Sequence, residues 1–123
     1  MKFTVDKKDK YCVFTLNERK LDSIVSPKVK SELVIINAEG FKNIILDLSE
    51  VEFIDSSGLS AILTGNRLCK DAGGTFVLAG ANDAVKKLLR ISQLEAILNV
   101  IPTVSESADY VMMEELERDF NDN

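Results

Sequence analysis

Asn43-Ile44-Ile45-Leu46-Asp47-Leu48 is a nearly continuous apolar run with the length of a β-strand. A strand with one wet face alternates apolar and polar side chains, whereas a strand covered on both faces is apolar throughout. The run therefore predicts a central strand of a sheet that helices cover on both sides.

The chain alternates between helix and strand after this run. We expect a helix over 56–72, a strand over 75–79, a helix from residue 82 or 83, a strand over 97–101 and a final helix from residue 103. Gly73 is placed to stop the first of these helices, and Thr103 with Glu106 forms a capping box for the last. Such alternation predicts parallel strands joined by right-handed crossovers.

The final helix carries one apolar face, which we expect to pack on the sheet. Its members are Val104, Ala108, Val111, Met112 and Leu116. Residues 118–123 follow as an acidic tail that is expected to fray. A single domain over residues 1–117 is the resulting prediction.

Two short β-prone runs open the chain, over residues 3–5 and 11–16, and predict an antiparallel strand pair at one edge of the sheet. Residues 17–25 are expected to be a loop with a short strand near Leu21. Ser26-Pro27 then offers an N-cap and a proline at the first helical position. The predicted fold is α/β, with a mixed sheet of four or five strands and about four helices.

Composition excludes several classes of function. The 123 residues include 20 acidic and 15 basic ones, for a net charge of −5. A nucleic-acid binder needs a basic face, so we expect no nucleic-acid partner. No apolar run approaches the ~18 residues that span a bilayer. Residues 1–10 are polar and charged, unlike a secretory signal. We therefore expect no direct membrane insertion and a cytoplasmic protein.

The sequence contains no histidine and two cysteines. No Ser-His-Asp or Cys-His arrangement can form, nor can a histidine-containing or all-cysteine zinc site. Phosphate-binding glycine loops are also missing. We expect no catalytic residue, no cofactor and no metal. Cys12 and Cys69 lie in apolar surroundings and are expected to be buried, reduced thiols.

The stretch Asp55-Ser56-Ser57-Gly58-Leu59 is the candidate functional segment. It follows an apolar strand and starts a helix, which places Ser56 or Ser57 at the N-cap. The first N–H groups of a helix are unpaired and the helix dipole is positive there, so a phosphate on Ser56 could be accommodated. Gly58 is interpreted as leaving room beside the hydroxyl for a partner. On local chemistry alone, ordinary helix caps are the favoured explanation of the two serines.

This segment, with the apolar stretch 48–54 before it and a helix, Gly73-Gly74 and a buried strand after it, resembles the anti-sigma factor antagonists of the STAS domain family. Residues 84–89 and 92–94 also resemble that family's third helix and the turn after it. The resemblance implies that Ser56, directly after the aspartate, is the phosphoacceptor. It implies a partner-binding surface of Asp55, Ser56, Ser57, Gly58 and Leu59 with Leu21 and Asp22.

A partner-switching mechanism is what the resemblance implies. The unphosphorylated antagonist would bind an anti-sigma factor that is itself a serine kinase, phosphorylation of Ser56 would end the complex, and a metal-dependent serine phosphatase would reset it. One segment departs from the family pattern. Residues 17–22, Asn-Glu-Arg-Lys-Leu-Asp, stand where the family often has a Gly-Glu-Leu-Asp-like turn, which leaves the identity of the partner open.

Three other interpretations remain. The first is a STAS subunit of a lipid or other membrane transport complex. The second is a receiver domain phosphorylated on Asp47, although Asp6 and Asp9 are poorly spaced to hold magnesium. The third is a hydrolase that uses Ser56, which lacks a histidine to activate the hydroxyl.

Overall fold

The structure is a computed structural model that describes residues 1–121. Its main sheet has the strand order β1-β2-β4-β6-β7. These strands are β1 (Phe3–Lys7), β2 (Cys12–Leu16), β4 (Ile44–Asp47), β6 (Phe76–Ala79) and β7 (Asn99–Ile101). β1 pairs with β2 antiparallel and every other pairing is parallel, so the predicted mixed sheet with β4 at its centre is confirmed.

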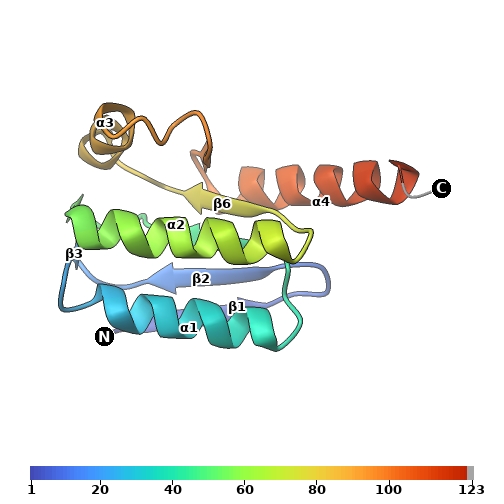
Figure 1. Cartoon of the computed structure of the whole chain (residues 1–123), viewed down its shortest axis with the longest axis horizontal. Helices are drawn as coiled ribbons and strands as arrows, with labels where there is room; N and C mark the ends of the chain where they lie inside the picture. The colour runs from blue at the N-terminus through green and yellow to red at the C-terminus, as the bar shows by residue number, and fades with distance from the viewer. Residues whose placement is uncertain (122–123) are drawn as a thin grey trace.

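Helices cover both faces of this sheet. α1 (Ser26–Ala38) and α2 (Ser56–Asp71) lie side by side on one face, while α4 (Val104–Asn121) packs on the other, and α3 (Asp83–Ile91) lies beyond the end of β6 (Figure 1). A second, two-stranded parallel sheet joins β3 (Lys20–Leu21) to β5 (Phe53–Ile54). It brings the segment after β2 against the residues that lead into α2.

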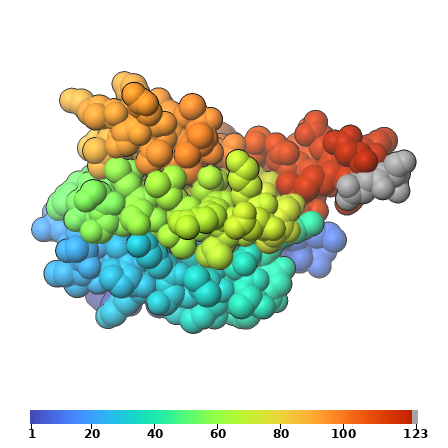
Figure 2. Space-filling model, in the orientation of Figure 1, coloured from blue at the N-terminus to red at the C-terminus, as the bar shows by residue number. Residues whose placement is uncertain are grey.

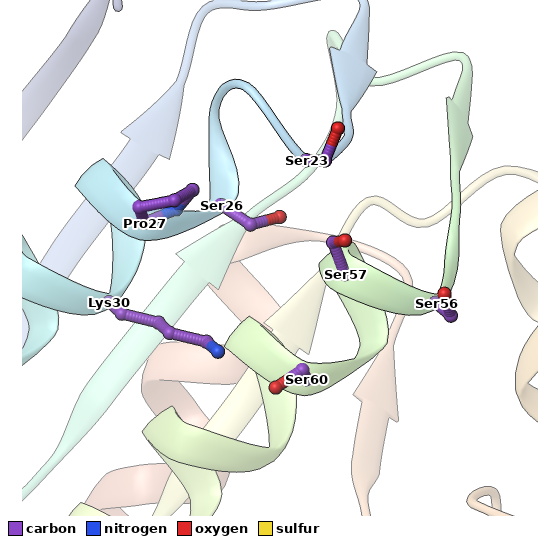
Figure 3. A pocket seen from close by; sticks show the side chains of 7 residues that line it. All are labelled: Ser23, Ser26, Pro27, Lys30, Ser56, Ser57 and Ser60. Atoms are coloured by element: carbon purple, nitrogen blue, oxygen red, sulfur yellow. The ribbon is translucent and has the colours of Figure 1, made fainter.

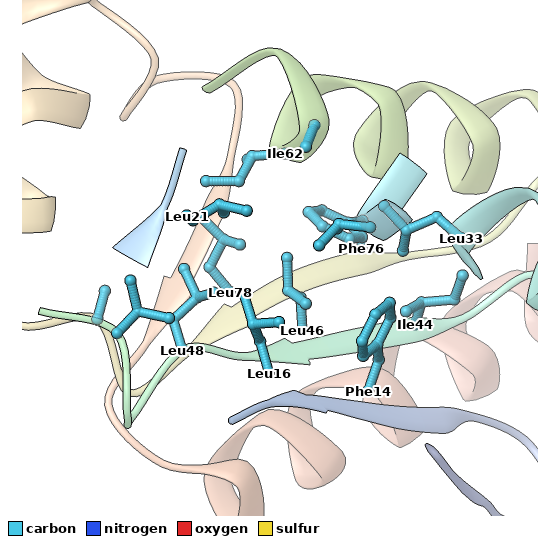
Figure 4. Packing of buried hydrophobic residues seen from close by; sticks show 14 of the residues in the cluster. Phe14, Leu16, Leu21, Leu33, Ile44, Leu46, Leu48, Ile62, Phe76 and Leu78 are labelled. Atoms are coloured by element: carbon cyan, nitrogen blue, oxygen red, sulfur yellow. The ribbon is translucent and has the colours of Figure 1, made fainter. Parts of the chain in front are cut away.

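Side chains of the central strands alternate between two cores. Phe14, Leu46 and Leu78 point toward α1 and α2 and form the larger core (Figure 4). Their neighbours Val13, Ile45 and Val77 point the other way and pack with Val111 of α4. Because successive side chains of a strand face opposite sides, an unbroken apolar run feeds both cores.

The start of α1 differs from the prediction. Ser26 is the first helical residue and not the cap; Val25 occupies the N-cap and no side chain caps the helix there. The Asp22 carboxylate instead accepts hydrogen bonds from the N–H groups of Ile24, at 3.0 Å, and Val25, at 3.2 Å. These bonds stabilise the turn before the helix, and Pro27 is the second helical residue, one position later than predicted.

The face of α4 that packs on the sheet was predicted in part wrongly. Val111 is buried, but Met112 and Leu116 are exposed, and the inward positions near the C-terminus are polar. Glu115 Oε1 accepts hydrogen bonds from Asn43 Nδ2 at 2.7 Å and from Arg118 Nη2 at 2.6 Å. These hydrogen bonds, and not the apolar periodicity, decide which side of α4 faces the sheet near its C-terminus, because a buried charge must be paired. We call Asn43, Thr75, Glu115 and Arg118 the polar latch.

The latch also alters the expectation for the C-terminus. Arg118 donates to Thr75 Oγ1 at 2.9 Å and to Asn43 Oδ1 at 3.1 Å, which ties the end of α4 to the starts of β4 and β6. α4 extends to Asn121, so residues 118–121 belong to this helix, where the sequence predicts an acidic tail that frays. Residues 122 and 123 of that tail lie outside the described residues.

Glu115→Gln is expected to lower the free energy of unfolding by about 1.5–3 kcal/mol at pH 7, the range for a hydrogen bond to a charged group. Burial alone would raise the pKa of Glu115, but the hydrogen bonds from Asn43 and Arg118 outweigh it and hold the pKa below its ordinary value of 4.5. A carboxylate with a lowered folded-state pKa stabilises the fold above its unfolded-state pKa, and this contribution is lost as the pH falls through the folded-state value.

Urea unfolding of the parent and of Glu115→Gln, repeated from pH 7 downward, measures this effect. The gap between the two proteins should be full at pH 7 and should narrow below about pH 4.5. Glu117→Gln, at an exposed position between the latch residues Glu115 and Arg118, is the matched control and should change stability little. An equal loss in both variants would contradict the assignment of the latch.

Both cysteines are buried and free, as predicted. Burial raises the pKa of Cys12 to about 11 and that of Cys69 to about 12. Because the thiolate is the reactive form, labelling by a thiol reagent at pH 8 should be at least ~100-fold slower in the native protein than in denaturant. With a chromogenic disulfide reagent, the absorbance of the thiolate that the reagent releases gives the labelling rate. Rapid labelling of both cysteines in the native protein would show that they are not buried.

Candidate functional site

Asp55 caps the helix on which the candidate serines lie. Its backbone is extended, with φ −113° and ψ −170°, and its Oδ1 accepts a hydrogen bond from the Gly58 N–H at 3.0 Å. The prediction that Ser56 or Ser57 would be the N-cap is therefore wrong by one residue. The two serines occupy the first turn of α2, and neither hydroxyl is needed to cap the helix.

Ser56 and Ser57 differ in their surroundings. Ser56 is exposed, whereas Ser57 is partly buried where α2 approaches α1. Figure 3 shows Ser57 toward α1 and Ser56 at the side of α2 farther from it. An enzyme or partner that approaches from solvent therefore reaches the Ser56 hydroxyl more easily than that of Ser57.

A groove of about 380 Å³ lies between the first turns of α1 and α2. It is lined by Ser23, Ser26, Pro27, Lys30, Ser56, Ser57 and Ser60. Ser26 points from α1 toward Ser57, and Lys30 extends from α1 toward Ser60 (Figure 3). Two helix N-termini and one ammonium group thus face the groove, which makes its floor favourable for negative charge.

Ser26 is an unusual member of this groove. Its side chain is 2% exposed, and its Oγ has no hydrogen-bond partner among the described residues. A buried hydroxyl without a partner costs free energy in the isolated protein. The groove therefore offers an unused donor beside the serines of α2.

Two predicted site residues support the surface from beneath. Leu21 is fully buried, and Gly58 is buried against it. A Cβ at Gly58 would lie 2.4 Å from the backbone oxygen of Leu21 and 3.1 Å from the Ile54 Cβ. The interpretation that Gly58 leaves room for a partner is wrong, because the space is filled by β3. The glycine instead lets α2 start directly against the two-stranded sheet.

Asp22 and Leu59 lie at the edge of the same surface. Asp22 is partly exposed, although its Oδ1 serves the turn before α1. Leu59 is partly buried and packs against the larger core. The structure thus brings the two predicted segments together, with Ser56 exposed, Asp55 half-buried beside it, and the others at the edge or below.

Two apolar side chains beside this surface were not among the predicted site residues. Ile24 and Phe53 are both exposed, and the Lys20 ammonium lies 5.2 Å from the centre of the Phe53 ring. Arg19 pairs with Glu52 at 2.8 Å across the two-stranded sheet. The hydrogen bond and the charge of Arg19 lower the pKa of Glu52. Large apolar residues next to turn residues were the sequence signal that could have marked Ile24 and Phe53 as part of this surface.

No three acidic or cysteine side chains within residues 1–121 gather in a way that could hold a metal ion. Over the same part of the chain, no helix combines the length and apolar character needed to cross a membrane.

Comparison with known proteins places this arrangement in a family. The sequence model of the STAS domain matches residues 2–107. The chain belongs to the STAS domain family. This matched region contains both segments of the candidate site, from Leu21 to Leu59, and ends within the first turn of α4.

Relatives of this STAS domain are named as anti-sigma factor antagonists. A candidate antagonist of Thermotoga neapolitana is 36% identical over 73 residues, a match that covers 59% of this chain and 65% of that protein. The anti-sigma F factor antagonist of Paenibacillus polymyxa is 32% identical over 81 residues, which cover 65% of this chain and 69% of that one. The chain therefore matches about two thirds of the length of these relatives.

A crystal structure shows the same architecture. The candidate anti-sigma factor antagonist of Thermotoga maritima superposes with a TM-score of 0.80 at 28% identity, covering 89% of this chain and 94% of that one. The predicted STAS fold is confirmed. Anti-sigma factor antagonists are non-enzymatic regulators, which agrees with the prediction that this STAS protein is not an enzyme.

Proposed function

We propose that this STAS protein is an anti-sigma factor antagonist that binds an anti-sigma factor while Ser56 is unphosphorylated and is switched off when Ser56 is phosphorylated. The anti-sigma factor is proposed to be the serine kinase, and a serine phosphatase returns the antagonist to its binding form. Because sigma factors act on transcription, the protein is placed in the cytoplasm. It needs no cofactor of its own for this role.

The observation that carries the proposal is that Asp55 caps α2 and Ser56 takes no part in the cap. Asp55 caps α2 through Gly58, so the Ser56 hydroxyl is exposed in the first turn and structurally dispensable. A residue with no part in the cap can gain or lose a phosphate with little change in the fold. Asp55, Ser57 and Leu59 lie around it, and we propose that they form the contact surface with Asp22 at its edge.

The charge of a phosphate explains both halves of the switch. A phosphoserine carries about −1.5 to −2 charges at neutral pH. Within the free protein, the N-terminus of α2 and the groove with Lys30 accommodate this anion. At an interface, the same anion stands beside Asp55 and must be desolvated, so the complex is weakened unless the partner supplies a new cation.

Displacement of a sigma factor tests the proposed function. The purified protein is added to the complex of a fluorescently labelled sigma factor with the anti-sigma factor encoded nearest to this protein's gene. We expect the unphosphorylated protein to release the sigma factor, seen as a fall in fluorescence anisotropy. Failure to release it, together with co-purification with a transporter ATPase, would overturn the proposal and favour the STAS subunit of a transport complex.

A further inference from the structure

The outer side of α4 carries a row of exposed apolar side chains. Met112, Met113, Leu116 and Phe120 are 39%, 63%, 57% and 83% exposed, and we call these four residues the α4 stripe. Met112 and Met113 precede Leu116 by four and three residues, and Phe120 follows it by four, which places the stripe on one side of the helix. The stripe extends over about 12 Å of helix, at a rise of about 1.5 Å per residue. Isolated surface apolar residues need no explanation, but a continuous row of four large ones marks an interaction site.

The α4 stripe cannot be buried by a rotation of the helix. Val111 is fully buried on the opposite side, and Glu115 and Arg118 are held by the polar latch at distances from 2.6 to 3.1 Å. Turning the stripe inward would expose Val111 and leave two charged groups without partners. The exposed row is therefore a fixed feature of the folded chain.

Acidic residues surround the α4 stripe. Glu106, Asp109 and Glu117 are exposed on the same helix. The one basic residue of α4, Arg118, belongs to the inward-facing latch. A second copy of α4 laid on the stripe would bring these carboxylates against one another, which disfavours self-association. An apolar row with an acidic rim is complementary to a helix that is apolar on one side and basic at its borders.

From this complementarity we propose that the α4 stripe is a docking site for a basic amphipathic helix of a partner protein. Amphipathic helices bind through apolar anchors at spacings of three and four residues, the same spacing that the stripe offers. Two of its four members are methionines, whose flexible side chains adapt to differently shaped partners. Lysine or arginine at the borders of the partner helix would meet Glu117 and Asp109.

This docking site is separate from the Ser56 surface. α4 lies on the opposite face of the sheet from α1 and α2 (Figure 1). In the space-filling view, α4 extends past the rest of the body at the C-terminal end (Figure 2). Most of α4 also lies beyond residues 2–107, the part that matches the STAS domain. Both surfaces can therefore be occupied at once, and the inference stands independently of the proposed function.

Binding of a model helix tests the proposal. The probe is a fluorescein-labelled peptide of leucine and lysine at heptad spacing, titrated with the full chain and followed by anisotropy. Leu116→Glu with Phe120→Glu should weaken binding by about tenfold or more, the effect expected for loss of two central apolar anchors. Val34→Glu with Ile35→Glu, two exposed apolar residues on α1, is the matched control and should bind as the parent does.

Two further experiments decide which kind of helix binds to the stripe. Asp109→Lys with Glu117→Lys should weaken binding of the lysine peptide, and a leucine–glutamate peptide should bind poorly to the parent. Equal binding of the parent and the Leu116/Phe120 variant would overturn the proposal, as would equal binding of both peptides. Light scattering that shows a dimer in the parent and a monomer in that variant would assign the stripe to a second copy instead.

Discussion

Ser56→Asp should weaken binding to the anti-sigma factor by roughly a hundredfold or more, which corresponds to ~3 kcal/mol. The added carboxylate stands beside Asp55 at the proposed contact surface and must lose its water in the complex. Ser56→Ala should bind as tightly as the unphosphorylated parent and should stay bound in the presence of kinase and ATP. Isothermal titration calorimetry of the three proteins against the anti-sigma factor measures the difference.

The same substitution should change the stability of the folded protein very little. An acidic residue in the first turn of a helix is favourable by about 0.3–1 kcal/mol, so the melting temperature of Ser56→Asp should equal or slightly exceed that of the parent. Ser105→Asp is the matched control, because Ser105 is an exposed serine in the first turn of α4, on another face of the molecule. If Ser105→Asp weakened binding as much, net charge and not position would explain the effect.

Gly58→Val should destabilise the protein strongly, by about 3 kcal/mol or more, the upper part of the range for overpacking a filled site. The first carbon of the new side chain would lie 2.4 Å from the Leu21 backbone oxygen, and a backbone atom in a sheet cannot move aside cheaply. With ~4 °C of melting temperature lost per kcal/mol in a domain of this size, the transition should fall by roughly 10 °C or more.

Ser60→Val separates this clash from the effect of a β-branched residue in a helix. Ser60 is exposed two residues further along α2, so the same side chain meets solvent there and should cost only about 0.5 kcal/mol. Circular dichroism melting curves of both variants compare the two positions. A Gly58→Val protein that melts like the parent but no longer binds its partner would restore the interpretation of Gly58 as an open contact position.

The order of strands and helices could be predicted because the signals are local. The apolar run at 43–48 needs cover on both faces wherever it lies, and Gly73 stops α2 with a positive φ of 77°. Asn82 caps α3 through the Val85 N–H, and Thr103 caps α4 through the Glu106 N–H. The helix stop and the two caps each depend on residues within four positions of one another, and the apolar run spans only six.

The errors arose where residues distant in sequence decide the outcome. Gly58 is buried because β3, more than thirty residues earlier, lies against it. α4 turns Glu115 inward because Asn43, 72 residues away, is there to bind it. The choice of Asp55 over Ser56 as the cap is a local contest between two good capping residues, which sequence preference alone does not resolve.

Phosphopeptide mass spectrometry after incubation with the cognate kinase and ATP tests the central claim most directly. The parent and Ser57→Ala should each carry one phosphate on Ser56, and Ser56→Ala should carry none. Loss of phosphate in Ser57→Ala with retention in Ser56→Ala would move the switch to Ser57. A parent protein that accepts no phosphate on either serine would contradict the account.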